Sequence, residues 1–161
     1  MTTKKKVYLA SFIAPMLIMF VAWAIDGFFP FGTKSLMAVD FNAQYIGLYA
    51  YFKHLFLNGD WSSFFYSFSK SIGGGMLGIW GFNLLSPFNL LFLLTSEENF
   101  QWVVPIVIAL RYGAMGLTMA HFLVKRYDGL KNKTYLVPIV ATIYALNGFN
   151  VSYQMNPIFY D

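Results

Sequence analysis

The chain begins with a long apolar run that predicts a membrane span. Lys4, Lys5 and Lys6 precede nineteen uncharged residues, 7–25. At about 1.5 Å per residue, a helix of this length matches a hydrocarbon layer about 30 Å thick. A basic start before an apolar run is also typical of a secretory signal peptide. The run is longer than a usual signal core, and we therefore expect a retained span.

A loop and an amphipathic helix are predicted to follow this span. Residues 26–39 hold two glycines and a proline, and they predict a loop. Asp40 is a good N-cap for a helix, and Asn58-Gly59 is a plausible stop. One face of this helix is apolar: Phe41, Tyr45, Leu48, Phe52 and Leu55. The other face is more polar: Asp40, Gln44, Gly47 and Tyr51. Because the helix carries charged residues, we expect it in the interface plane of a bilayer.

Three further apolar runs complete the pattern. The first, 71–96, is crowded with glycines and interrupted by Ser86-Pro87, so one straight helix is not expected. The second, 99–124, carries a single charge, Arg111. A basic segment, 125–133, separates it from the last run, 134–160.

The charge pattern predicts how many of these runs cross the membrane. Basic segments tend to stay in the cytoplasm, so the N-terminal lysines and 125–133 should lie on the same side. An even number of crossings must then separate them, and 71–95 is the weakest candidate. The resulting prediction is an all-α integral membrane protein, a single membrane domain over 1–161 with a cytoplasmic N-terminus. We expect spans at 7–25, 101–124 and 134–153. The large external loop, 26–100, would contain juxtamembrane and re-entrant helices.

An alternative topology keeps four spans and places the basic segment outside. Orientation rules have exceptions, so this alternative stays open at the level of sequence.

Composition supports a membrane environment and excludes several kinds of site. Hydrophobic residues make up 58% of the chain and charged residues 11%, against about 25% charged in a typical soluble domain. The absence of cysteine excludes disulfides and thiolate chemistry. The net charge of +4 is clustered, which fits membrane topology and not nucleic-acid binding.

Candidate chemistry is confined to few side chains. No serine, histidine and acid are spaced as a nucleophilic triad, and the glycines at 73–75 lack the lysine of a phosphate-binding loop. Chemistry would rest on Asp40, Arg111 and Asp161. A cation within a span is costly, so Arg111 is paired structurally with Asp26, Asp40 or Asp161, extends outward to the interface, or binds a ligand. Asp40 is either a helix cap or a catalytic group, and these two roles are compatible.

Several stretches resemble, in order and spacing, the bacterial membrane protein family YfhO. They are "PFGTKSL" (30–36), "DFNAQY" (40–45), "FFYSFSKSIGGGMLG" (64–78), "LLSPFNLLFLL" (84–94), "RYGAMGLTMAHFLVKR" (111–126) and "IYALNGFNVSYQMNPIFYD" (143–161). No single stretch is specific, but the ordered set is. Family members are several times longer, so we expect this chain to be an N-terminal fragment.

The resemblance implies a glycosyltransferase of the GT-C type. Such enzymes take a sugar from a polyprenyl-phosphate carrier outside the membrane and, in Gram-positive bacteria, are linked to teichoic-acid glycosylation. The acidic residue of their first external loop corresponds to Asp40, which would act as general base or help to hold a divalent metal. Arg111, Gln44, Tyr45 and Asp161 are expected to bind substrate. The expected partners are membrane lipid, the polyprenyl-phosphate sugar and a cell-envelope polymer, with no nucleic acid. A non-enzymatic membrane protein, such as part of a transporter, is the alternative.

Overall fold

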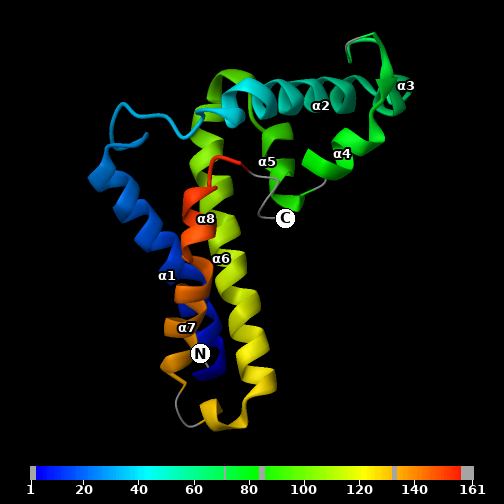
Figure 1. Cartoon of the computed structure of the whole chain (residues 1–161). Helices are drawn as coiled ribbons and strands as arrows, with labels where there is room; N and C mark the ends of the chain where they lie inside the picture. The colour runs from blue at the N-terminus through cyan, green and yellow to red at the C-terminus, as the bar shows by residue number, and fades with distance from the viewer. Residues whose placement is uncertain (1–2, 71, 84–85, 132–133, 157–161) are drawn as a thin grey trace. The chain divides into compact units, whose positions relative to one another are not determined.

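The computed structural model describes residues 3–70, 72–83, 86–131 and 134–156, and these form mainly helices (Figure 1). The chain divides into two compact units. The first contains the residues up to Lys34 and those from Ile108 to Gln154. The second contains the residues from Ser35 to Val107. Each unit has its own buried core and is described by itself.

The first unit is built on long apolar helices. Its elements are α1 (Thr3–Asp26), the part of α6 (Phe100–Arg126) from Ile108 onward, η4 (Asp128–Lys131), α7 (Leu136–Ala145) and α8 (Gly148–Ser152). The predicted spans 7–25 and 101–124 therefore lie within single helices. Among the described residues, two helices are long and apolar enough to cross a membrane, Lys4–Asp26 and Glu97–Arg126.

The third predicted span, 134–153, differs from a single helix. The helix α7 ends at Ala145, and α8 begins at Gly148. Asn147 lies between them in an extended conformation, and its side-chain oxygen accepts a hydrogen bond from the Asn150 amide at 3.1 Å. This asparagine therefore starts a new helix where the sequence pattern suggested that the old one continues.

Small residues allow α1 and α6 to pack closely. A Cβ atom at Gly116 would lie 2.1 Å from the Ser11 carbonyl oxygen, and one at Gly113 would lie 2.8 Å from the Met16 sulfur. The contact at Gly116 is with backbone, which cannot give way, so this position requires glycine, whereas the contact at Gly113 is with a side chain that can shift. Farther along the same helices lies an apolar cluster of Val7, Ala120, Leu123, Val137 and Ala141. It joins α1, α6 and α7, and α7 runs beside α1 (Figure 1).

The second unit consists of short helices and one hairpin. Its elements are η1 (Phe41–Tyr45), α2 (Ile46–Asn58), α3 (Trp61–Phe65), β1 (Tyr66–Ser67), β2 (Gly74–Gly75), α4 (Leu77–Asn83), η2 (Pro87–Asn89), α5 (Leu90–Leu93) and η3 (Glu97–Asn99). The strands are antiparallel, with Tyr66 opposite Gly75 and Ser67 opposite Gly74. The broken 71–95 segment thus has no single straight helix in its described residues, as the glycines and Ser86-Pro87 predicted.

The helix predicted from Asp40 to Asn58 exists, but its start differs from the prediction. Asp40 has helical backbone angles and makes no side-chain cap hydrogen bond. An N-cap needs an extended backbone so that its side chain can fold back onto a free amide. Here the helical hydrogen bonds already begin at Val39, whose carbonyl accepts from the Ala43 amide at 3.0 Å. The predicted cap is therefore wrong. The predicted stop is confirmed, because Gly59 has the left-handed φ of 65°.

A π-helical turn changes the buried face of this helix. The turn η1 inserts an extra residue, which shifts the register of the side chains that follow. Tyr49 is consequently buried in place of the predicted Leu48, which is only half-buried. The core of the unit is aromatic, and Tyr49 stacks on Phe92 with 4.3 Å between ring centroids. Phe92 in turn meets the edge of Phe100, the first residue of α6, at 5.0 Å.

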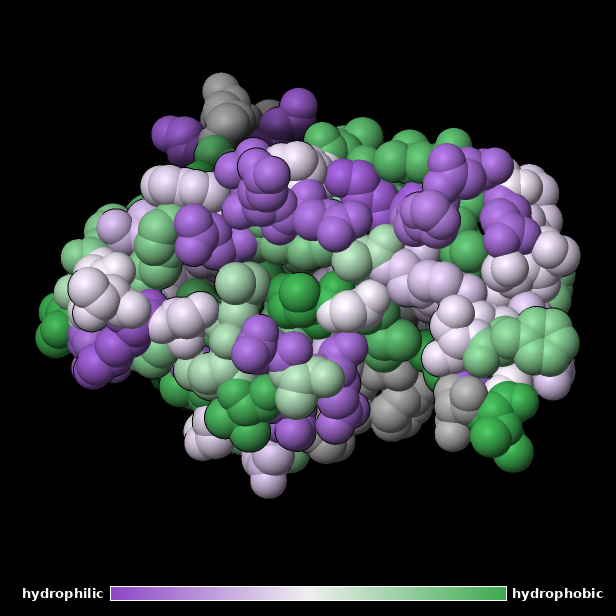
Figure 2. Space-filling view, turned by 90° about the horizontal axis from the view of Figure 1, so that it is seen from above, coloured by the Kyte–Doolittle hydropathy of each residue, from purple (hydrophilic) through white to green (hydrophobic). Residues whose placement is uncertain are grey.

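Hydrophobic residues also lie on the molecular surface. Figure 2 shows hydrophobic side chains exposed beside hydrophilic ones on one face. The exposed apolar residues include Leu17, Val21 and Ile25 of α1. A surface of this kind suits a lipid environment better than water.

Candidate functional site

Asp40 lies at the head of the aromatic helix and is partly exposed. Its carboxylate is not used as a helix cap, so its charge is available for another role. The preceding residue, Val39, has a φ of 53°, which is unusual for a β-branched side chain. Strained backbone of this kind is often found at functional sites, where the surrounding structure holds it in place. Asp40 is thus presented by a locally strained turn.

Two of the predicted substrate-binding residues share this segment with Asp40. Gln44 is exposed, whereas Tyr45 is buried within the aromatic core. Burial raises the pKa of the Tyr45 phenol, and the negative charge of Asp40 raises it further. The two side chains are therefore close enough to interact electrostatically. At neutral pH the Tyr45 hydroxyl keeps its proton and can act as a hydrogen-bond donor.

This electrostatic coupling predicts a measurable change in the titration of Tyr45. Asp40→Asn should lower the pKa of Tyr45 toward its ordinary value, because a neighbouring negative charge disappears. The pKa should still remain above that value, because burial is the larger cause of the shift. The measurement is an NMR titration of the ¹³Cζ-tyrosine-labelled protein, with Tyr45→Phe to assign the signal. An unchanged Tyr45 pKa in Asp40→Asn would contradict the placement of Asp40.

The remaining predicted site residues lie elsewhere. Arg111 belongs to the first unit, lies within α6 and is only 3% exposed. It is flanked along the helix by the buried Tyr112. Asp161 lies outside the described residues. The structure therefore gathers Asp40, Gln44 and Tyr45 in one segment and places Arg111 in the other unit.

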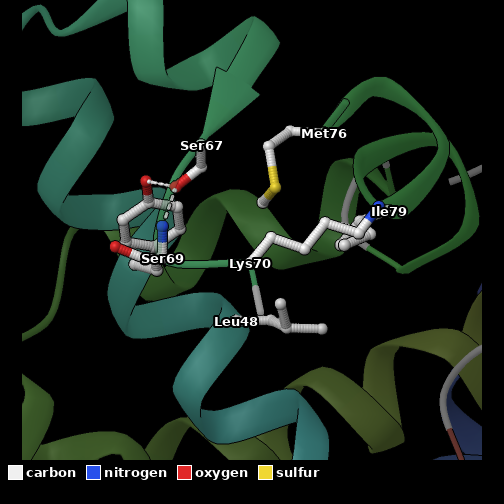
Figure 3. Close-up of a pocket in the computed structure, with 7 residues that line it drawn as sticks. Leu48, Ser67, Ser69, Lys70, Met76 and Ile79 are labelled. Carbon is white, nitrogen blue, oxygen red and sulfur yellow. Dashed lines mark hydrogen bonds between the residues drawn. The ribbon is translucent and has the colours of Figure 1, made fainter. Parts of the chain in front are cut away.

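The second unit contains a pocket that the sequence did not predict. Its volume is about 220 Å³, and it lies between α2, the β1–β2 hairpin and α4 (Figure 3). Leu48, Met76 and Ile79 form its apolar lining. Its polar lining consists of Tyr51, Ser67, Ser69 and Lys70.

Hydrogen bonds hold the polar side of this pocket in place. The hydroxyls of Tyr51 and Ser67 are 2.6 Å apart, and Ser67 is almost fully buried. The Ser67 hydroxyl oxygen also accepts a hydrogen bond from the Ser69 amide at 3.2 Å. On the hairpin, the Lys70 ammonium donates to the Gly75 carbonyl at 2.8 Å. Figure 3 shows the Lys70 side chain extending toward Ile79, away from Ser67 and Ser69.

The hairpin depends on its glycines and on a tryptophan behind it. Gly73 has a φ of 102°, and a Cβ atom there would lie 2.7 Å from the Tyr66 hydroxyl. Trp80 stacks on Phe64 at 5.4 Å and donates its indole N–H to the Phe64 carbonyl at 2.5 Å. Gly73 thus makes a sharp backbone bend. The neighbouring Ser-Phe-Ser-Lys run is the signal in the sequence that would have pointed to the pocket.

The histidine, aspartate and glutamate side chains of the described residues give little support for a metal centre. The described part of the chain contains no group of three or more histidine, aspartate or glutamate side chains that could hold an ion. Asp40 would supply a single carboxylate, fewer ligands than a dedicated divalent-metal site provides.

Comparison with protein families gives a match over nearly the whole chain. The model of the family described as bacterial membrane protein YfhO matches residues 11–161. Comparisons with curated proteins and with solved structures gave no match. The two long apolar helices agree with a membrane location. Because the family model covers all but the first ten residues, this chain belongs to the YfhO family of bacterial membrane proteins.

Proposed function

We propose that the protein acts as a membrane glycosyltransferase of the GT-C type. It would transfer a sugar from a polyprenyl phosphate to an acceptor of the cell envelope, such as a teichoic acid. The observation that carries this proposal is the carboxylate of Asp40, which is partly exposed and not used as a cap. It lies at the head of an aromatic helix that suits the membrane interface, where a lipid-borne sugar arrives.

The proposed reaction needs a base and a stabilised leaving group. The acceptor hydroxyl attacks the anomeric carbon of the sugar, and its proton passes to the Asp40 carboxylate. The bond between that carbon and the phosphate oxygen breaks, and the phosphate leaves with the electron pair. A cation is needed to stabilise the charge that develops on the phosphate. Gln44 and Tyr45 would position the acceptor substrate beside Asp40.

Because Asp40 would supply only a single carboxylate to a metal ion, we favour the role of general base for it over that of metal ligand. A divalent metal would add electrophilic stabilisation of the phosphate if it were bound. Asp40 would then be its ligand from this segment.

A transporter role is the second candidate. It is favoured by the burial of Arg111 within the long helix α6, because ionisable groups inside spans often mark transport pathways. The enzyme would attach the sugar to an acceptor, whereas a transporter would move the sugar across the membrane unchanged.

The test is a transfer assay on membranes that contain the protein. Radiolabelled polyprenyl-phosphate glucose is the donor, and incorporation of label into envelope polymer is measured. Transfer above that of membranes lacking the protein supports the enzyme. Uptake of the labelled sugar into proteoliposomes without transfer would replace the enzyme with the transporter.

The predicted three-span topology is tested with single cysteine substitutions, since the chain contains no cysteine of its own. In the three-span topology, Glu98→Cys should react with an impermeant thiol reagent in intact cells and Lys131→Cys should not. The four-span topology reverses both results. Ser62→Cys lies outside in either case and serves as the control for labelling. Reactivity of Lys131→Cys together with protection of Glu98→Cys would overturn the three-span topology in favour of the four-span one.

A further inference from the structure

We propose that the pocket in Figure 3 binds a phosphorylated hexose, with Lys70 on the phosphate and the Tyr51–Ser67 pair on the sugar ring. The inference rests on the proposed function, because it gives the headgroup of the lipid-borne donor a place of its own. It adds a binding site in the second unit, on residues to which the sequence assigned no role.

The volume of the pocket limits the ligand to about one ring. Pockets for drug-sized ligands measure about 300–1,000 Å³. At about 220 Å³, this pocket encloses less space than such a site, so it suits a small headgroup better than a nucleotide or a disaccharide. A single hexose ring fits the interior and leaves its phosphate at the mouth.

The two kinds of lining match the two kinds of surface on a sugar. Leu48, Met76 and Ile79 offer apolar contact to the C–H face of a ring. The linked hydroxyls of Tyr51 and Ser67 can accept and donate hydrogen bonds at the ring's edge. Trp80 supports this wall, because it stacks on Tyr51 with 6.1 Å between ring centroids. The hydroxyl pair is therefore held in position before a ligand arrives.

Lys70 supplies the charge that a phosphate requires. Its hydrogen bond to the Gly75 carbonyl fixes the ammonium on the hairpin, and a lysine ammonium carries further N–H groups that can reach a ligand. None of the residues that line the pocket is acidic. Asp60, in the same unit, is engaged at the start of α3, where its carboxylate accepts from the Ser62 hydroxyl at 2.8 Å and from the Ser63 amide at 3.1 Å. The positive charge at the mouth is thus available to an anion.

The surroundings of the pocket indicate a lipid-borne ligand. Phe68 and Ile72, on the hairpin, are 80% and 96% exposed, and Leu77 at the start of α4 is also exposed. Apolar side chains beside an ammonium suit a ligand whose phosphate joins a sugar to a hydrocarbon chain. We therefore commit to a lipid-linked hexose phosphate over a soluble one.

Binding measurements on the full-length protein in nanodiscs test this assignment. The probes are inorganic phosphate, glucose 1-phosphate and geranylphosphoryl glucose, and the method is isothermal titration calorimetry. The wild type should bind geranylphosphoryl glucose most tightly. Lys70→Gln should weaken the binding of all three probes by about tenfold or more, because a charge-assisted hydrogen bond is lost. Lys70→Arg should retain most of the affinity, and Lys34→Gln, the same change at an exposed lysine of the first unit, should have no effect.

Tyr51→Phe separates the sugar from the phosphate. It should weaken the binding of glucose 1-phosphate several-fold and leave that of inorganic phosphate unchanged. Equal losses for both probes would overturn the assignment of the sugar to the hydroxyl pair. Unchanged affinity of Lys70→Gln for every probe would overturn the site as a whole. Equal wild-type affinity for the two glucose phosphates would overturn the lipid-linked ligand in favour of a soluble one.

The results also distinguish this inference from the proposed function. Asp40→Asn should bind geranylphosphoryl glucose with unchanged affinity even where transfer is lost. Binding that depends on Lys70 in a protein without transferase activity would leave the pocket in place and overturn the enzyme. If the protein transfers sugar but its Lys70→Gln variant binds every probe normally, the enzyme would stand and the pocket would be overturned as the binding site.

Discussion

Replacing Asp40 with asparagine should reduce sugar transfer by about 10²–10⁴-fold and leave the amount of folded protein in the membrane unchanged. The large loss is expected because asparagine cannot take the proton of the acceptor hydroxyl. Stability should be preserved because the Asp40 side chain makes no cap hydrogen bond and is partly exposed. Transfer is measured with radiolabelled polyprenyl-phosphate glucose, and protein abundance by quantitative immunoblotting of the same membranes.

Asp60→Asn is the matched control for this experiment. It makes the same chemical change in the same unit, at a residue that caps α3 through the Ser63 amide. Asparagine caps as well as aspartate, so this variant should keep both its fold and its transfer activity. Full activity in Asp40→Asn would remove the catalytic role of Asp40. Loss of protein in Asp40→Asn alone would show that the carboxylate is structural.

Replacing Gly116 with leucine should strongly destabilise the first unit. Even a Cβ atom at this position would meet the Ser11 carbonyl at 2.1 Å and a carbon of Pro15 at 3.1 Å. Backbone cannot move aside as a flexible side chain can, so α1 and α6 would have to separate. Overpacking of this kind typically costs about 1–3 kcal/mol or more, which is a large part of the stability of a small protein. The expected result is a sharp loss of monodisperse protein in detergent and a lower melting temperature.

Gly47→Ala is the matched control for the glycine substitution. Gly47 lies within α2, and a Cβ atom there would have no neighbour within 4 Å. Alanine favours a helix over glycine by up to about 1 kcal/mol, so this variant should melt at the same or a higher temperature. Normal melting of Gly116→Leu would contradict the close packing of α1 on α6.

Local sequence patterns were sufficient for the elements that depend on local composition. The uncharged run 7–25 lies within α1, and 101–124 lies within α6, because long apolar runs favour a helix whatever surrounds them. Gly59 ends α2 because glycine adopts the left-handed conformation at little cost. In contrast, 134–153 is divided by Asn147, whose role as a cap is visible only once its partner Asn150 is in place.

Local patterns did not predict the backbone conformation and the buried face at the candidate site. Asp40 was predicted as a site residue from the sequence, but its predicted cap was wrong because Asp40 itself already has helical backbone angles and the helical hydrogen bonds begin at the Val39 carbonyl. Tyr49 was missed because a π-helical turn shifts the register by one residue, which a regular helical spacing does not predict.

The sequence by itself determined the long apolar helices, the loop after the first of them, and the family through the order of its motifs. These features follow from composition and from spacing along the chain. Only the tertiary structure decided which face of the aromatic helix is buried, why Gly116 must be small and that Tyr51 meets Ser67. Tyr51 and Ser67 lie sixteen residues apart, on different elements. Their contact depends on a hairpin held by glycine backbone and by the stacking of Trp80, and such pairings between distant residues leave no periodic trace in the sequence.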